Sequence, residues 1–323
     1  MTCFASVVCK ACLWLCVIVF STSCAAQSPV VVRVWGSPQM SNLLQVWEND
    51  FCGSHPEVRF VNELKSTVTA AAGVYTDRAD IGALGREIWP SEVEAFRSIK
   101  GHPPLLIAAA GGSFDVPKAT FALMLFVHRD NPTTELTMEQ VRQAFSEAKD
   151  RSSARTWGEL GAKGAWASRP IHLYGFATQN DKSMIFRDLV FKREDLWAGE
   201  VQQFEAVKGV DAGQRILDTL ANDPYGLAIS NVHYARPEVR PLRLVVHGKR
   251  IQATRQTVAT HEYPLSREVF LIADPATLTP AGREFLNYVA SPEGQRDVLK
   301  AGDYLPLPEA ILQRERARLA HQR

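Results

Sequence analysis

Three turns in the first third of the chain carry side chains that can bind a small anion. Ser37 lies in "WGSPQM", where a serine can cap a helix and the following proline suits its first position. Ser66 and Thr67 lie in "ELKSTVTAAA", before a helix of small residues. Arg86 lies in "IGALGRE", directly after an apolar run. Hydroxyls, free helix-start amides and a guanidinium are groups that recognise oxyanions.

The elements that must position these side chains are strands that run side by side. Each of the three turns joins a predicted strand to a predicted helix, and ligands of open α/β sheets bind beyond the carboxyl ends of the strands. A single capped helix start usually binds only water. The prediction of an oxyanion site therefore depends on the three turns meeting at one edge of a sheet.

Short apolar runs alternate with helical patterns along the whole chain, which indicates an α/β fold. Most of the runs lack the strict alternation of a sheet with one wet face, so we expect them to be covered on both faces. Nine runs are predicted strands: 30–35, 58–61, 79–84, 104–110, 120–127, 170–176, 225–230, 242–246 and 268–273. Predicted helices begin after the caps Ser37, Thr137, Asp211 and Thr279.

The length of 323 residues favours two domains or two lobes. Two segments, "GGSFDVPK" at 111–118 and "ATHEYPLS" at 259–266, are candidate crossings between them. With both as hinges, the first lobe comprises 28–115 and 262–308 and the second comprises 116–261. Residues 309–323 form a charged tail, which we expect to be a solvated, frayed helix.

The first 26 residues have the pattern of an export signal. Lys10 precedes the apolar stretch "ACLWLCVIVF", which small residues follow. Cleavage after Ala26 is one interpretation. The other is a lipoprotein signal ending at residue 23, with a lipid on Cys24. Both predict a protein in the periplasm or on the outer face of the cell membrane.

Several segments together resemble the periplasmic phosphate-binding proteins, the substrate-binding subunits of ABC phosphate importers. The segment "ADIGALGRE" is similar to the family's A-D-I-G-x-x-S-R, and "DPYGLAISNVHYA" to its N-x-I-G-Y segment. The longest similarity lies in "YPLSREVFLIA" and "FLNYVASPEGQRDVLKAGDYLPLP". The resemblance covers nearly all of the mature chain. It implies the type II periplasmic-binding fold, in which each of two lobes has a central mixed sheet flanked by helices.

The resemblance also implies roles for particular residues. Two lobes would close on an oxyanion, most simply phosphate, and then dock on an ABC permease. Ser37 and either Ser66 or Thr67 would bind oxygens from the first lobe. Arg86 would be the charge partner, and Ser183 would close from the second lobe. No cofactor and no catalytic residue are implied.

The chain departs from the family pattern in two places. Gly85 occupies a position where relatives carry aspartate or serine. The segment 176–183 reads "FATQNDKS" where the family has an arginine followed by G-S-G-T, and Asp181 brings a negative charge close to the anion. An alternative function is therefore an envelope-tethered sensor or scaffold of the same fold that has lost or changed its ligand.

Other chemistry has little support in the sequence. The eight histidines are scattered without the spacing of a zinc site, and no G-x-S-x-G nucleophile elbow occurs. The formal net charge of +1 provides no overall field to attract nucleic acid. We therefore expect a binding protein without a metal, and not an enzyme.

Overall fold

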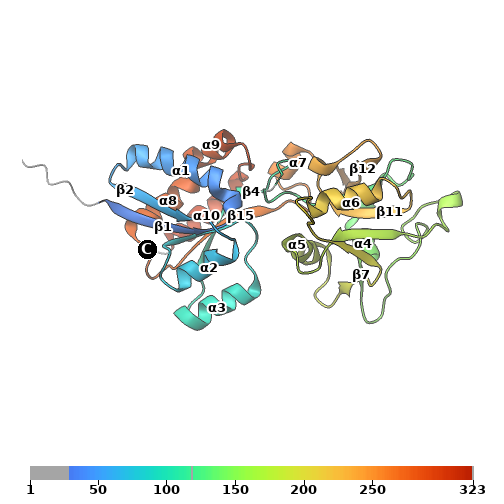
Figure 1. Cartoon of the computed structure of the whole chain (residues 1–323), viewed down its shortest axis with the longest axis horizontal. Coiled ribbons are helices and arrows are strands. Elements are labelled where there is room, and N and C mark those ends of the chain that lie inside the picture. The colour runs from blue at the N-terminus through green and yellow to red at the C-terminus, as the bar shows by residue number, and fades with distance from the viewer. Residues whose placement is uncertain (1–28, 118, 322–323) are drawn as a thin grey trace, which may run out of the picture.

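Two five-stranded sheets organise the computed structural model, which describes residues 29–117 and 119–321 (Figure 1). The first sheet has the order β2-β1-β3-β15-β4, and the second has the order β10-β8-β11-β5-β12. Each sheet mixes parallel and antiparallel pairs and carries helices around it. The fold is thus the predicted two-lobed α/β arrangement, and we name the lobes after the first and second sheets.

The first lobe is built from both ends of the described chain. Its strands are β1 (Val30–Gly36), β2 (Val58–Glu63), β3 (Ile81–Leu84), β4 (Leu105–Gly111) and β15 (Glu268–Ala273). Its helices are η1 (Pro38–Met40), α1 (Ser41–Ser54), α2 (Val68–Tyr75), α3 (Pro90–Lys100), α8 (Pro280–Val289), α9 (Pro292–Ala301) and α10 (Glu309–Ala320).

The second lobe comes from the middle of the chain. Its main strands are β5 (Met124–His128), β8 (His172–Phe176), β10 (Val201–Phe204), β11 (Gly226–Ser230) and β12 (Val239–Pro241). Shorter strands are β6 (Glu135–Thr137), β7 (Ser146–Glu147), β9 (Leu196–Trp197), β13 (Arg243–Val246) and β14 (Lys249–Ile251). The helices are α4 (Met138–Phe145), η2 (Gly164–Trp166), α5 (Asp181–Val190), α6 (Ala212–Leu220), η3 (Val232–Tyr234) and α7 (Arg255–Ala259).

The chain passes between the lobes twice, once after β4 and once before β15 (Figure 1). The sequence predicts the crossings at 111–118 and 259–266, and these positions stay predictions. The residue-level boundaries at 115 and 261 stay predictions.

All nine predicted strands coincide with strands of the structure, and the predicted caps hold. Thr137, Asp211 and Thr279 each accept a backbone N–H at the start of α4, α6 and α8. Ser37 caps the short helix η1, which leads directly into α1. The apolar stripe of this segment, from Met40 to Phe51, is buried against the first sheet.

The C-terminal segment corrects one expectation. Helix α10 is not a solvated tail, because Leu312 and Leu319 are buried and the helix packs against β4 and α8. The buried Glu315 carboxylate accepts from Arg314 and Arg318 on the same helix. Charge spacing suggested an exposed helix, whereas two leucines seven residues apart supply a packing face.

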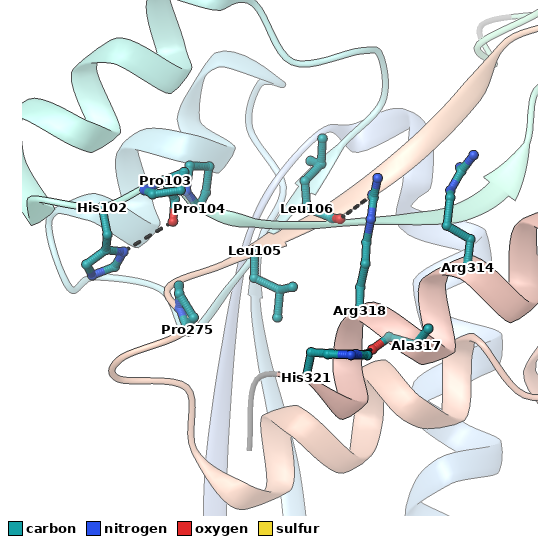
Figure 2. A pocket seen from close by; sticks show the side chains of 10 residues that line it. All are labelled: His102, Pro103, Pro104, Leu105, Leu106, Pro275, Arg314, Ala317, Arg318 and His321. Atoms are coloured by element: carbon teal, nitrogen blue, oxygen red, sulfur yellow. Dashed lines mark hydrogen bonds between the residues drawn. The ribbon is translucent and has the colours of Figure 1, made fainter.

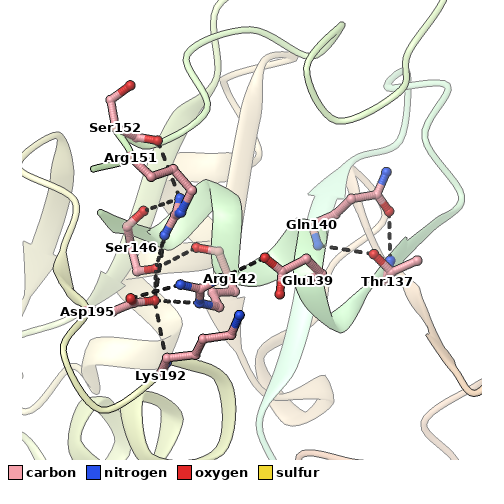
Figure 3. Close-up of polar contacts among 9 residues, drawn as sticks. All are labelled: Thr137, Glu139, Gln140, Arg142, Ser146, Arg151, Ser152, Lys192 and Asp195. Carbon is pink, nitrogen blue, oxygen red and sulfur yellow. Dashed lines mark hydrogen bonds and ion pairs between the residues drawn. The ribbon is translucent and has the colours of Figure 1, made fainter. Parts of the chain in front are cut away.

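A buried ion pair stabilises the second lobe (Figure 3). Arg142 on α4 donates from Nε and Nη2 to the two oxygens of Asp195, at 2.5 and 2.9 Å. The Ser146 hydroxyl donates to the same carboxylate at 2.9 Å. Hydrogen bonding to Arg142 is the largest influence on the carboxyl and lowers the pKa of Asp195 to about 2.

In residues 29–117 and 119–321, none of the helices combines the length and the apolar character needed to cross a membrane. The predicted export signal at 1–26 and Cys24 lie outside the described residues.

Candidate functional site

The three predicted turns meet at one edge of the first sheet. Strands β1, β2 and β3 run parallel, so their carboxyl ends lie together. A cavity of about 310 Å³ opens there, between the lobes. The first lobe contributes Gln39, Ser66, Thr67, Gly85, Arg86 and Trp89 to its wall, and the second contributes Gln179, Asn180 and Asp181.

Ser37 lies behind this wall. It is fully buried, and its hydroxyl accepts from the Gln39 N–H at 3.3 Å. The preceding Gly36 has a φ of +152°, and a Cβ atom at that position would collide with the carbonyl of Ala83 on β3. Glycine is therefore required for β1 to turn this close to β3. Ser37 packs behind the residues that line the cavity and does not line it itself.

Ser66 and Thr67 reach the cavity from the turn before α2. The Ser66 N–H donates to the Gly36 carbonyl at 3.0 Å, which ties the second turn to the first. Thr67 occupies the N-cap of α2 without accepting a cap hydrogen bond through its side chain. Both residues are half-buried, so their hydroxyls can turn toward a bound ion.

Arg86 lines the cavity but is already paired. Its Nη1 and Nη2 donate to the two oxygens of Glu92 at 2.9 and 2.8 Å, and Nη1 also donates to the Glu87 carbonyl. Its guanidinium carbon lies 3.8 Å from the ring centroid of Trp89. The residue is only 5% exposed, so the guanidinium is held at a fixed place by Glu92 and Trp89. An anion would therefore meet an ion pair rather than a free cation.

Gly85 lies where a side chain would collide with its neighbours. A Cβ atom would lie 2.5 Å from the Ser37 hydroxyl oxygen and 3.2 Å from Gln39 Oε1. The Thr120 hydroxyl donates to the Gly85 carbonyl, and Tyr304 donates to the Gln39 carbonyl at 3.2 Å. Thr120 comes just after the first crossing, so its hydrogen bond ties the start of the second lobe to the Gly85 turn at the cavity.

Asp181 supplies the wall from the second lobe, at the first position of α5. Arg267 donates from Nη1 and Nη2 to Asp181 Oδ2, both at 3.2 Å, and Lys182 donates to Oδ1 at 3.3 Å. Arg267 also holds Glu87 of the first lobe at 2.7 Å. Burial opposes ionisation of Asp181, but Lys182 and Arg267 outweigh burial and lower the pKa of its carboxyl. Asp181 is thus an ionised group facing the cavity.

Ser183 does not line the cavity. It is buried on α5, and its hydroxyl donates to the Phe176 carbonyl at 2.7 Å. In this arrangement Ser183 fixes α5 against β8, and a role in closing on the ligand stays a prediction. The helix that was expected to present Ser183 instead presents Asn180 and Asp181.

Sequence reasoning missed Gln39, Trp89 and Gln179 as wall residues, and it missed Arg267 as the link between the lobes. Gln39 lies two residues after Ser37, so the predicted cap at Ser37 could have indicated that Gln39 also lies near the cavity. Trp89 and Glu92 form a capping arrangement at the start of α3. Nothing in the local pattern of "YPLSREVF" shows that Arg267 reaches across the lobes.

A second cavity, of about 840 Å³, lies at the opposite edge of the first sheet (Figure 2). It is formed at the amino end of β4 and beside α10, with Pro103, Leu105 and Pro275 among its apolar residues and Arg314 and Arg318 extending from α10 beside them. Arg314 and Arg318 are both bonded to Glu315. This cavity lies away from the carboxyl ends of β1 and β3 and shares no residue with the cavity between the lobes.

Within the described ranges, no three His, Cys, Asp or Glu side chains come together in a way that could hold a metal ion. The cavity between the lobes instead presents hydroxyls, amides, one paired guanidinium and one carboxylate. These groups can bind a small polar solute.

The fold and this cavity are those of a two-lobed α/β binding protein. Residues 23–293 match the family described as the PBP superfamily domain, and the chain belongs to that family. It is 28% identical over 287 residues to the "Phosphate-binding protein PstS" of Pseudomonas aeruginosa, which covers 86% of this chain and 84% of that protein.

Solved structures share the fold. An ABC-type phosphate transport receptor from Vibrio cholerae aligns with a TM-score of 0.57 at 15% identity, covering 86% of this chain and 100% of that one. PstS from Borrelia burgdorferi aligns with a TM-score of 0.58 at 14% identity, covering 86% and 99%. A phosphate-bound substrate-binding protein from Clostridium perfringens aligns with a TM-score of 0.52 at 19% identity, covering 86% and 100%.

Proposed function

We propose that this protein is exported, captures a small oxyanion between its lobes, and delivers it to an ABC importer, with phosphate as the ligand. The observation that carries the proposal is the cavity at the carboxyl ends of β1 and β3, where Ser66, Thr67 and Arg86 meet. The similarity to a phosphate-binding protein over 86% of the chain supports the choice of phosphate.

The mechanism is ligand-stabilised closure of the lobes. Hydroxyls and amides of the first lobe replace part of the hydration shell of the ion, and Gln179 and Asn180 reach it from the second lobe. Micromolar affinity requires about 8 kcal/mol. Hydrogen bonds to charged groups contribute about 1.5–3 kcal/mol each, so about three to six of them are needed. The closed form then docks on the permease.

Isothermal titration of the exported protein with phosphate tests the proposal. We expect a single site with micromolar or tighter affinity and a rise in melting temperature with phosphate concentration. The proposal would be refuted if phosphate, arsenate, sulfate and molybdate all gave no binding heat and no thermal shift. Loss of phosphate uptake in cells that lack the protein, together with its recovery from the periplasmic or membrane fraction, tests the importer role and the predicted location.

A further inference from the structure

The cavity of about 840 Å³ at the amino end of β4 has no part in the proposed capture of an oxyanion (Figure 2). Among the described residues ten line it, and none of these is acidic. Three prolines, two leucines and one alanine form its apolar part, and His102, Arg314, Arg318 and His321 are its basic side chains. Apolar hollows of about 300–1,000 Å³ with a few polar groups are the usual form of a small-molecule site.

Helix α10 supplies the basic wall of this cavity. Arg314, Arg318 and His321 are spaced four and three residues apart, so they lie on one face of the helix. Another face of the helix packs against β4 and α8 through its buried leucines. Ala317 lies between the two arginines on the basic face, and its methyl group is too small to fill the hollow. The helix thus lines the cavity with cations and leaves space beside them.

The charge of this wall is only partly neutralised. The fully buried Glu315 is shared by Arg314, which donates from Nε at 2.9 Å, and Arg318, which donates from Nη1 at 3.2 Å. Two cations therefore share one carboxylate. Each guanidinium carries five N–H donors and gives one nitrogen to Glu315, so donors remain for a ligand. The two arginine side chains are 51% and 49% exposed, so a ligand can reach them.

We propose that this cavity binds an anionic amphiphile, a carboxylate or phosphate group carried on a hydrocarbon chain. The chain lies on the prolines and on Leu105, and the anionic group accepts hydrogen bonds from Arg314 and Arg318. A planar guanidinium suits either anion, because it can donate two parallel hydrogen bonds.

The shape of the cavity favours a single ligand molecule over a membrane surface. Leu105 is buried at the base, whereas Arg314 and Arg318 are half exposed at the wall. A flat bilayer surface could touch the arginines without reaching the leucine. The cavity shares no residue with the one between the lobes, so this inference is independent of the proposed function.

Calorimetric titration with fatty acids, each kept below its micelle concentration, tests the proposal. We expect one decanoate per protein and an affinity that rises up to about fourfold for each CH₂ added from hexanoate to decanoate, because the chain is buried. Acetate has the anionic group without the chain, and octyl glucoside has the chain without the charge. Each should bind at least about tenfold more weakly than octanoate.

Two kinds of variant separate the charge from the hollow. Arg314→Gln combined with Arg318→Gln should weaken decanoate binding at least about tenfold, whereas Arg296→Gln removes an exposed arginine on α9 and should not. Ala317→Leu keeps both arginines but fills the space between them, so it should also weaken binding at least about tenfold. Ala320→Leu, an exposed change on the same helix outside the cavity, is its control. Phosphate affinity should be unchanged in all four variants.

Decanoate binding that is unaffected by Ala317→Leu, or that does not depend on chain length, would overturn the inference. Co-sedimentation with phosphatidylglycerol vesicles without binding of monomeric decanoate would also overturn it and would indicate a membrane surface. A glutamate-rich peptide that binds as tightly as decanoate would overturn it in favour of an acidic protein partner. Phosphate binding is titrated separately, so its failure would refute the proposed function and leave this inference standing.

Discussion

Arg86 and Glu92 face each other as a two-pronged ion pair at the edge of the cavity, with both terminal guanidinium nitrogens bonded to the carboxylate. The pair places a positive group where the resemblance predicts one, but it also neutralises that group. Arg86 therefore contributes fixed donors more than net charge.

Removing the negative partner should strengthen anion binding. In Glu92→Gln the guanidinium keeps a neutral acceptor and regains its uncompensated charge, so we expect phosphate to bind about 3- to 10-fold more tightly at low salt. The gain should shrink as ionic strength rises. Calorimetric titration at two salt concentrations measures both effects. Glu94→Gln, an exposed change on the same helix, is the control and should have a small effect; equal gains in both variants would contradict the prediction.

A side chain at Gly85 should disturb the floor of the cavity. In Gly85→Ala the new methyl group would press on Ser37 and Gln39, and overpacking of this kind costs about 1–3 kcal/mol. We expect a lower melting temperature and weaker phosphate binding. Gly53→Ala, on an exposed part of α1 with no atom near the new methyl group, should be neutral or slightly stabilising. Full stability in Gly85→Ala would show that Ser37 can move aside.

The buried pair of Asp195 and Arg142 should make stability depend on acid pH. The folded pKa of Asp195, about 2, lies below the unfolded value of about 3.9. Its stabilisation is therefore present above pH 4 and is lost as the pH falls toward 2. Asp195→Asn should be less stable by about 3 kcal/mol at neutral pH, with a difference that narrows below pH 4.

Urea unfolding between about pH 2.5 and about pH 7 measures this dependence, because the stabilisation by the ion pair should be lost as the pH falls from about 4 toward about 2. Glu139→Gln is the control, because Glu139 pairs with the same Arg142 from an exposed position and should cost less than about 1 kcal/mol. A pH-independent difference between the native protein and Asp195→Asn would rule out the ion pair as its source.

Glu48 on α1 should have the opposite dependence. Burial is the main influence and raises its pKa to about 7, although Asn62 donates to both carboxylate oxygens. The folded protein then binds more protons than the unfolded chain between about pH 4.3 and 7, so stability falls as pH rises through this window. At about pH 8, one unit above the window, Glu48→Gln should be more stable than the native protein. Near the lower end of the window, at about pH 4.3, the two proteins should have similar stability. Parallel thermal melts give the comparison, and a variant destabilised at both ends would contradict it.

The strands and capped helices could be predicted from the sequence because their signals are local. Runs such as 30–35 and 268–273 are apolar, and Thr137 and Thr279 cap helices that begin at the next residue. Short strands such as β7 and β9 were missed, because their two residues are too few to show the alternation of apolar and polar residues that marks a strand.

The site was only partly predictable because its side-chain directions depend on tertiary contacts. The meeting of Ser66, Thr67 and Arg86 followed from the parallel strands, whereas the pairing of Arg86 with Glu92 did not. Ser183 has the residue type expected of a ligand-binding position, yet its hydroxyl satisfies the Phe176 carbonyl. The link from Arg267 to Asp181 joins residues 86 positions apart and exists only when the lobes are assembled.

Helix α10 and the segment before it have a further consequence for the first sheet, whose last strand is β4. Leu305 pairs with Gly111 at one end of that strand, and Arg318 donates to the Leu106 carbonyl near the other. An exposed outermost strand is a template on which a second molecule can extend the sheet. By occupying these backbone groups, the C-terminal segment leaves fewer of them open to pairing with a second molecule.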